Sequence, residues 1–232
     1  MMSNKRYPRK NIEEIIFRGE DSKILRMAGG LHGHFCPFLA LGVKAGSYLI
    51  RELRAESEGM ENVLAVVETN NCFSDGIQYS TGCSFGNNAL VFKDVGKTAV
   101  TLAKRDEKAI RASLRPNASQ VWEEDYPEYS KLFEKVVEQR EGDEEDRSRM
   151  NDLSRKISFE VICMSADDFF NFEMVEPDLP EFAPIFESCR CDKCGDTVME
   201  SRIVEIGGSK LCLPCADKNY YELNGSGIRE RN

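Results

Sequence analysis

Hydrophobic residues recur at helical spacing in two parts of the N-terminal half. The first part is residues 11–27, which is interrupted near Gly19 and is predicted to end at the pair Gly29 and Gly30. The second part is residues 38–53, which follow Pro37, a residue that suits the first turn of a helix. Small residues recur along this second segment. We therefore expect another element to pack closely against it.

Continuous apolar runs and helical spacing predict the elements that follow. Strands are expected at residues 63–67, 90–92, 98–103 and 157–164, and helices at residues 73–79 and 107–114. Helices and strands alternate irregularly along the chain. This order favours an α+β fold, with a mixed β-sheet core and packed helices.

The second half of the chain changes in composition twice. Residues 123–156 are highly charged but keep an apolar helical stripe around Leu132 and Val136, so part of this segment is expected to pack on the core. Its acidic run, residues 141–146, is predicted to be a solvated loop. Prolines between Glu176 and Ser188 predict a linker. The predicted organisation is a main domain at 1–175, a linker at 176–188 and a small domain at 189–232.

Composition narrows the function classes. The 232 residues carry a net charge of −9, which argues against a general nucleic-acid or anionic-membrane binder because phosphate binding needs clustered Lys and Arg. The polar N-terminus does not resemble a secretory signal, and no run approaches the length of a membrane span. We expect a cytoplasmic protein. Its nine cysteines are then reduced thiols, suited to metal or redox chemistry.

Four cysteines near the C-terminus have the spacing of a structural metal site. Cys191-x2-Cys194 is separated by 17 residues from Cys212-x2-Cys215, and two such pairs supply the four thiolates that Zn²⁺ prefers in a tetrahedral site. An iron–sulfur cluster, a rubredoxin-like iron site and two unrelated thiol pairs are the alternatives. A hairpin is expected about Gly207 and Gly208, and a short helix at 216–223. Cys189 need not be a ligand. Four thiolates leave no open position, so this site is predicted to be structural.

A second cluster is predicted in the main domain. The only two histidines, His32 and His34, lie within four residues of Cys36, just before a predicted helix whose N-terminus would favour a thiolate. Cys72 and Cys83 lie at element boundaries. Cys163, by contrast, lies within an apolar run and is predicted to be a core residue.

Four blocks of the main domain resemble the FmdE family, whose name refers to formylmethanofuran dehydrogenase. They are His32-Gly33-His34-Phe35-Cys36-Pro37-Phe38-Leu39-Ala40-Leu41-Gly42, Cys72-x2-Asp75-Gly76-Ile77-Gln78, Thr81-Gly82-Cys83-Ser84-Phe85-Gly86 and Asp94-x-Gly96-Lys97-Thr98-Ala99. The C-terminal four-cysteine module is similar to one that many members carry. The family's usual loop lysine is replaced here by Asn87, but Lys97 remains.

The resemblance implies a mixed-sheet α+β fold, a homodimer and a cavity that can hold a metal ion. His34, Cys36, Cys72 and Cys83 would line this cavity as ligands of a second metal or as nucleophile and base. Asp75 and Lys97 would be their polar neighbours.

Three functions remain open from the sequence. The first is a metal- or thiol-dependent enzyme or accessory protein of one-carbon or molybdenum/tungsten metabolism, such as an oxidoreductase subunit of the formylmethanofuran dehydrogenase type found in methanogenesis. The second is a non-catalytic metal carrier or sensor whose zinc module docks a protein partner. The third is a redox carrier that uses Cys72 and Cys83 as a dithiol, although they are 11 positions apart, unlike the closely spaced pairs of disulfide oxidoreductases.

Overall fold

A computed structural model describes residues 7–105 and 107–232. The chain forms two compact units, Met1–Leu179 and Pro180–Asn232. The boundary between them falls inside the segment that the sequence predicts to be a linker. Each unit is described by itself below.

The N-terminal unit is built on a five-stranded mixed sheet with the order β2-β1-β3-β4-β5. Its strands are β1 (Val63–Val67), β2 (Leu90–Phe92), β3 (Ala99–Lys104), β4 (Ala109–Leu114) and β5 (Phe170–Val175). β1 and β2 are parallel, and the other neighbouring strands are antiparallel. The expected α+β class with a mixed sheet is confirmed.

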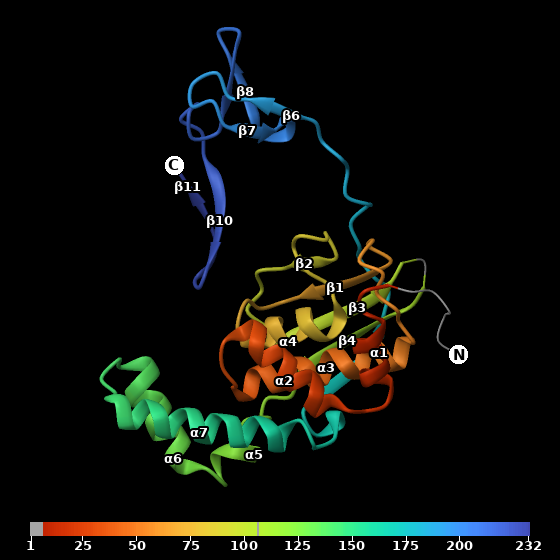
Figure 1. Cartoon of the computed structure of the whole chain (residues 1–232), viewed down its shortest axis with the longest axis vertical. Helices are drawn as coiled ribbons and strands as arrows, with labels where there is room; N and C mark the ends of the chain where they lie inside the picture. Colours follow the sequence, from red (N-terminus) through yellow and green to blue (C-terminus); the bar gives the residue numbers. More distant parts are fainter. Residues whose placement is uncertain (1–6, 106) are drawn as a thin grey trace. The chain divides into compact units, whose positions relative to one another are not determined.

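Helices α1 (Lys10–Phe17), α2 (Asp21–His32), α3 (Pro37–Leu53) and α4 (Cys72–Thr81) form the helical layer of this unit. Figure 1 shows α3 and α4 lying across one face of the sheet, and α3 contacts β3 and β4 while α4 contacts β1. The largest side chains in this layer have no exposed surface: Leu39, Leu41, Leu49, Ile50, Phe73 and Ile77. Their burial supplies the apolar core that fixes the two helices on the sheet.

The backbones of α3 and α4 touch at two glycines. A Cβ atom on Gly76 would lie 2.5 Å from the Leu39 carbonyl oxygen, and one on Gly42 would collide with the Phe73 carbonyl oxygen. Only glycine permits such an approach. The close packing expected for the segment 38–53 is confirmed, and it brings the N-terminal ends of both helices together.

A second group of helices packs beside α3. It comprises α5 (Gln120–Glu123), α6 (Pro127–Phe133), the π-helix η1 (Glu134–Glu138) and α7 (Glu144–Val161), and is followed by the short helix η2 (Ala166–Asp168). α7 begins with a capping box in which Asp143 and Asp146 each accept a hydrogen bond from the other's backbone N–H. Tyr129 from α6 and Leu153 and Ile157 from α7 join the core.

Several expected elements of this unit differ in the structure. Residues 157–164 are not a strand, because Ile157, Ser158 and Val161 face the core at helical spacing as the end of α7. Residues 109–114, within the helix expected at 107–114, form β4, which pairs on both sides, with β3 and with β5. The prediction for Cys163 is also wrong. It follows α7 on the surface and is exposed.

The N-terminal end of the candidate site also departs from the prediction. α2 does not end at Gly29 and Gly30 but continues to His32, and Gly33 terminates it with a positive φ of 90°. His32 is therefore held by a helix rather than carried on a loop.

The C-terminal unit consists of short antiparallel hairpins. They pair β6 (Ser188–Arg190) with β7 (Thr197–Met199), β8 (Ile203–Ile206) with β9 (Ser209–Cys212), and β10 (Tyr220–Asn224) with β11 (Gly227–Arg231). The short helix η3 (Glu200–Arg202) precedes β8. The hairpin about Gly207 and Gly208 is confirmed. The helix expected at 216–223 is wrong, because Tyr220 to Leu223 pair with β11 instead. Within the described residues, no helix has the length and apolar character needed to cross a membrane.

Candidate metal centre

Four side chains from three helix ends meet in the N-terminal unit. They are His32, His34, Cys36 and Cys72, and one ligand atom from each lies within 4.8 Å of every other. His32 is the last residue of α2, Cys36 is the N-cap of α3, and Cys72 is the first residue of α4. The packing of α2, α3 and α4 therefore positions the group, which we call the His/Cys cluster.

Two helix N-termini favour negative charge at this cluster. The Cys36 sulfur accepts a hydrogen bond from the Leu39 backbone N–H at 3.4 Å and so caps α3. At α4, the Asn71 side chain caps the Phe73 N–H, and Cys72 follows directly at the first helical position. Backbone N–H groups and the helix dipole stabilise a thiolate in such positions.

The two thiols share their protons unequally. A hydrogen bond from Cys36, and then the charge of His32, lower the pKa of Cys72 to about 6. The same hydrogen bond, together with burial, raises the pKa of Cys36. At neutral pH the metal-free pair is therefore a Cys72 thiolate that accepts a hydrogen bond from the Cys36 thiol. Burial, and then the nearby His32, lower the pKa of His34, which favours its neutral form, the form that binds metals.

A carboxylate orients one of the histidines. His32 Nδ1 lies 2.7 Å from Asp75 Oδ2, and Asp75 Oδ1 accepts a hydrogen bond from the Gln78 amide at 3.1 Å. The other ring nitrogen, Nε2, lies 3.9 Å from the Cys36 sulfur. A carboxylate that holds one imidazole nitrogen while the other faces the cluster is the usual outer partner of a metal-binding histidine.

The structure gathers some of the predicted site residues and separates others. Cys36, Cys72 and His34 lie in the cluster, and Asp75 lies beside it. Cys83 lies outside the cluster: it is fully buried, its sulfur is 3.5 Å from the Val63 carbonyl oxygen, and burial raises its pKa to about 11. Lys97 is exposed in the connection between β2 and β3.

These positions change the predicted site in two ways. Cys72 pairs with Cys36 rather than with Cys83, which argues against the Cys72–Cys83 dithiol. His32, which the sequence places close to Cys36, takes the position in the group expected for Cys83. The signal for His32 was its spacing of four residues from Cys36. That spacing spans the helix end and the turn that separate the two side chains.

A large cavity adjoins the cluster. Its volume is about 820 Å³, and His34, Cys36 and Cys72 form part of its lining. Trp122, Tyr129 and Phe133 contribute aromatic surface from α5 and α6, and the first two are almost completely buried. Such a volume and lining suit a small organic molecule.

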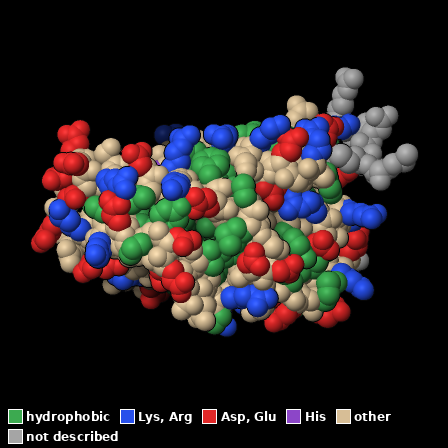
Figure 2. Space-filling model, turned by 90° about the horizontal axis from the view of Figure 1, so that it is seen from below, with side chains coloured by type: hydrophobic (Ala, Val, Ile, Leu, Met, Phe, Trp, Pro, Cys, Tyr) green, Lys and Arg blue, Asp and Glu red, His purple; other side chains and the backbone are tan. Residues whose placement is uncertain are grey.

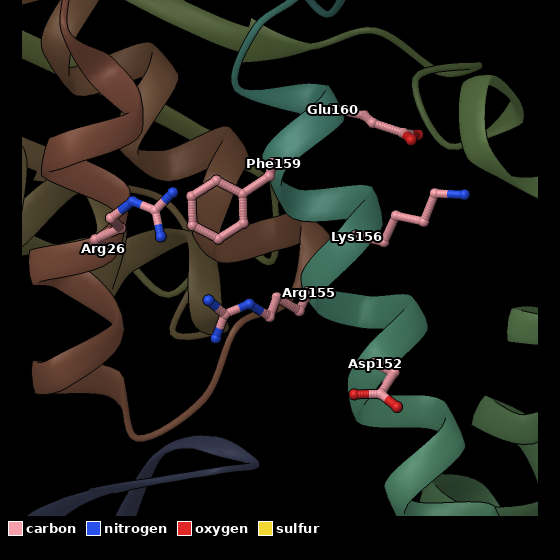
Figure 3. A pocket seen from close by; sticks show the side chains of 6 residues that line it. All are labelled: Arg26, Asp152, Arg155, Lys156, Phe159 and Glu160. Carbon is pink, nitrogen blue, oxygen red and sulfur yellow. The ribbon is translucent and has the colours of Figure 1, made fainter.

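A second, shallower depression of about 420 Å³ lies on another face of α7. Figure 3 shows Arg26 and Arg155 beside Phe159, and the two guanidinium carbons lie 4.7 and 5.7 Å from the centre of that ring. These arginines therefore make cation–π contacts with a surface aromatic residue. Acidic and basic side chains are interspersed over the face of the molecule in Figure 2. This depression holds none of the His/Cys cluster.

The C-terminal unit brings its four predicted cysteines together. One sulfur each from Cys191, Cys194, Cys212 and Cys215 lies within 4.8 Å of every other, while Cys189 lies outside this group. The Cys212 backbone N–H donates to the Cys191 sulfur at 3.4 Å, as in a metal-binding knuckle. Four thiolates are the donor set of a structural zinc site with no open position.

Two family models match the chain. The first, described as FmdE of the molybdenum formylmethanofuran dehydrogenase operon, matches residues 31–171. The second, described as a prokaryotic dksA/traR C4-type zinc finger, matches residues 184–221. The two matches fall on the unit with the His/Cys cluster and the unit with the four-cysteine group.

Two known proteins are similar over most of the chain. A curated protein of Archaeoglobus fulgidus, described as a probable S-adenosyl-L-methionine-binding protein, is 40% identical over 212 residues, which are 89% of this chain and 56% of that protein. The chain thus spans about half the length of this relative. The crystal structure of a tungsten formylmethanofuran dehydrogenase FmdE-like protein from Syntrophus aciditrophicus has a TM-score of 0.51 and 20% identity, covering 84% of this chain and 91% of that one. This second likeness shows a shared fold.

Proposed function

This chain belongs to the FmdE family, and we propose that its N-terminal unit uses a metal ion at the His/Cys cluster to bind a small organic molecule in the adjoining cavity. One observation carries the proposal. Three of the four cluster residues, His34, Cys36 and Cys72, also line the 820 Å³ cavity, so a bound molecule would reach the metal-binding atoms directly.

The donor set fits a borderline transition metal. Two imidazole nitrogens and two thiolate sulfurs are typical ligands of Zn²⁺, whereas Mg²⁺ and Ca²⁺ prefer oxygen. The Asp75 carboxylate supports the fit because it leaves His32 Nε2 facing the sulfurs. When bound, such an ion would supply Lewis-acid character to a ligand group in the cavity.

The cluster residues have different parts in this arrangement. Cys36 is buried, Cys72 and His32 are half-buried, and all three belong to helix ends. His34 is exposed between α2 and α3 and lines the cavity. We assign the fixed part of the site to the first three residues and the position nearest the bound molecule to His34.

S-adenosyl-L-methionine is the first ligand to test. The description of the Archaeoglobus fulgidus relative names it, and the aromatic lining of the cavity offers stacking surfaces for an adenine ring. Isothermal titration of the metal-loaded protein with this compound would measure binding directly.

Elemental analysis tests the metal part of the proposal. The wild-type chain should hold two metal equivalents, one in each unit. The double variant Cys36→Ser/Cys72→Ser should hold one, and Cys83→Ala, which removes a thiol outside the cluster, should keep both. A double variant that still holds two equivalents would show that the cluster binds no metal.

A role beside a formylmethanofuran dehydrogenase is the second candidate function. The name of the matching family and that of the Syntrophus aciditrophicus protein support it, because both refer to this enzyme. Gel filtration of this protein mixed with purified dehydrogenase should then show co-elution, and a chain ending at residue 179 would show whether the zinc unit makes the contact. Separate elution of the two proteins would count against this role. Light scattering of the protein alone tests the homodimer implied by the family resemblance.

A further inference from the structure

The cavity beside the His/Cys cluster has an unbalanced charge. Glu123 and Glu138 line it, and no lysine or arginine does so among the residues that the structure describes. If the cluster holds a divalent metal, as proposed above, two thiolates and two neutral imidazoles bring its net charge to zero. The cavity as a whole then carries two negative charges, both on glutamates that are exposed in the unliganded chain.

We propose that this cavity selects its ligand by charge, accepting an organic cation with an aromatic or apolar body and rejecting anions, and that Glu123 and Glu138 set this preference. The inference rests on the proposed function in one respect only, that the cavity is a ligand site. It adds the class of ligand and the residues that choose it.

The local structure places carboxylate and aromatic groups side by side. Glu123 follows Trp122 in α5, and both residues line the cavity. Phe133 ends α6, and the π-helix that begins at Glu134 presents Val137 and Glu138 to the same cavity. A π-helical turn widens the spacing between residues that share a face, and such turns are frequent at functional sites.

This combination suits a cation in two ways. The faces of aromatic rings attract a positive charge, and a carboxylate beside them adds direct attraction. Neither glutamate has a hydrogen-bonded or ion-paired basic partner within the described part of the chain, so both charges remain available. The basic residues Arg26, Arg155 and Lys156 line the separate depression shown in Figure 3.

Three small probes with the same phenylpropyl body test the proposal: phenylpropyl-trimethylammonium, phenylpropanol and phenylpropionate. Trp122 is the single tryptophan of the chain and lies in the cavity wall, so its fluorescence reports occupancy. The full-length metal-loaded protein should bind the cation about tenfold more tightly than the alcohol, and the carboxylate more weakly than both.

Charge-matched variants assign the preference to the two glutamates. Glu123→Gln/Glu138→Gln should weaken binding of the cation about tenfold and leave the alcohol unchanged. The control Glu124→Gln/Glu141→Gln removes the same charge from exposed positions outside the lining and should keep the wild-type order. Circular dichroism of each variant checks that the fold is retained.

The outcomes separate the two proposals. Equal or tighter binding of phenylpropionate, no binding of any probe up to millimolar concentration, or an unchanged order in Glu123→Gln/Glu138→Gln would each overturn the charge selection. A protein that holds no metal at the cluster but binds the probes in the expected order would overturn the metal proposal and leave the charge selection standing.

Discussion

His32 Nδ1 lies 2.7 Å from Asp75 Oδ2, which ties the last residue of α2 to the first turn of α4. The contact joins two of the three helix ends that form the His/Cys cluster. It also fixes the imidazole so that Nε2 faces Cys36. Asp75 therefore acts on the cluster through His32 and is a positioning residue.

Asp75→Asn should weaken metal binding at the cluster without unfolding the chain. The amide can still hydrogen-bond to the imidazole, but it lacks the charge that makes His32 a stronger ligand. Loss of such a partner typically lowers metal affinity about 10–100-fold. Competition with a chromophoric chelator measures the change. Asp125→Asn, at an exposed position away from the cluster, should retain the wild-type affinity. An unaltered affinity in Asp75→Asn would mean that the carboxylate does not support the metal.

The glycine contact between α3 and α4 should matter for both stability and metal binding. A Cβ on Gly76 would lie 2.5 Å from the Leu39 carbonyl oxygen and 2.6 Å from the Val43 nitrogen, so Gly76→Ala must push the helices apart. Overpacking of this kind costs about 1–3 kcal/mol of unfolding free energy. Because Cys36 and Cys72 begin these helices, the metal affinity of the cluster should fall as well.

Gly30→Ala is the matched control for this prediction. Gly30 lies inside α2, and a Cβ there would meet nothing within 4 Å. Alanine should therefore stabilise the helix by roughly 0.5–1 kcal/mol and leave metal binding unchanged. Urea unfolding and chelator competition measure both effects. Equal stability of the two variants would contradict the role of the glycine contact.

Local chemistry in the sequence predicted some elements well. Pro37 and the apolar spacing that follows it identify α3, and the spacing of four cysteines identifies the C-terminal metal group. In both cases the determining residues are close together in the chain. The apolar run at 157–164 was ambiguous, because a buried strand and the buried face of a helix have the same composition, and α7 extends into it.

The membership of the His/Cys cluster depends on long-range packing, which the sequence does not display. Cys72 and Cys83 both lie at ends of α4, one at its start and one just after its C-cap, Gly82. The helix carries them to opposite ends, so only Cys72 reaches Cys36. His32 joins the cluster because α2 extends past Gly29 and Gly30.

The thiol pair predicts an unusual pH dependence of alkylation. In the metal-free protein the pKa of Cys72 is lowered to about 6, so iodoacetamide should already react with this thiolate near its full rate at pH 7. The rate should fall as the pH drops through about 6, whereas in the urea-unfolded chain the same thiol should titrate near pH 8.5. Mass spectrometry of the Cys72 peptide measures the rate.

Cys36→Ala tests the cause of this shift. The hydrogen bond from Cys36 is the largest contribution that lowers the pKa of Cys72, so its removal should move the midpoint of alkylation to higher pH. The Cys36 thiol itself, whose pKa is raised, should react slowly across the same range in the wild-type protein. Identical pH profiles for Cys72 in the two proteins would show that the thiols do not share a proton.

The C-terminal unit should unfold when its metal is removed, whereas the N-terminal unit should not. Within residues 180–232, all of which the structure describes, the buried hydrophobic side chains are Cys191 and Ala216. So small a core cannot stabilise the hairpins. A structural zinc contributes an apparent binding free energy of about 10–16 kcal/mol in modules of this kind.

A strong chelator or Cys194→Ser should therefore make residues 180–232 sensitive to protease while the helical signal of residues 7–179 persists. Cys189→Ser is the matched control, because it removes a thiol from the same module but outside the four-cysteine group, and it should leave the unit resistant. Limited proteolysis followed by mass spectrometry locates the cleavage sites. Resistance of the C-terminal unit without its metal would mean that the hairpins are stable through their own contacts.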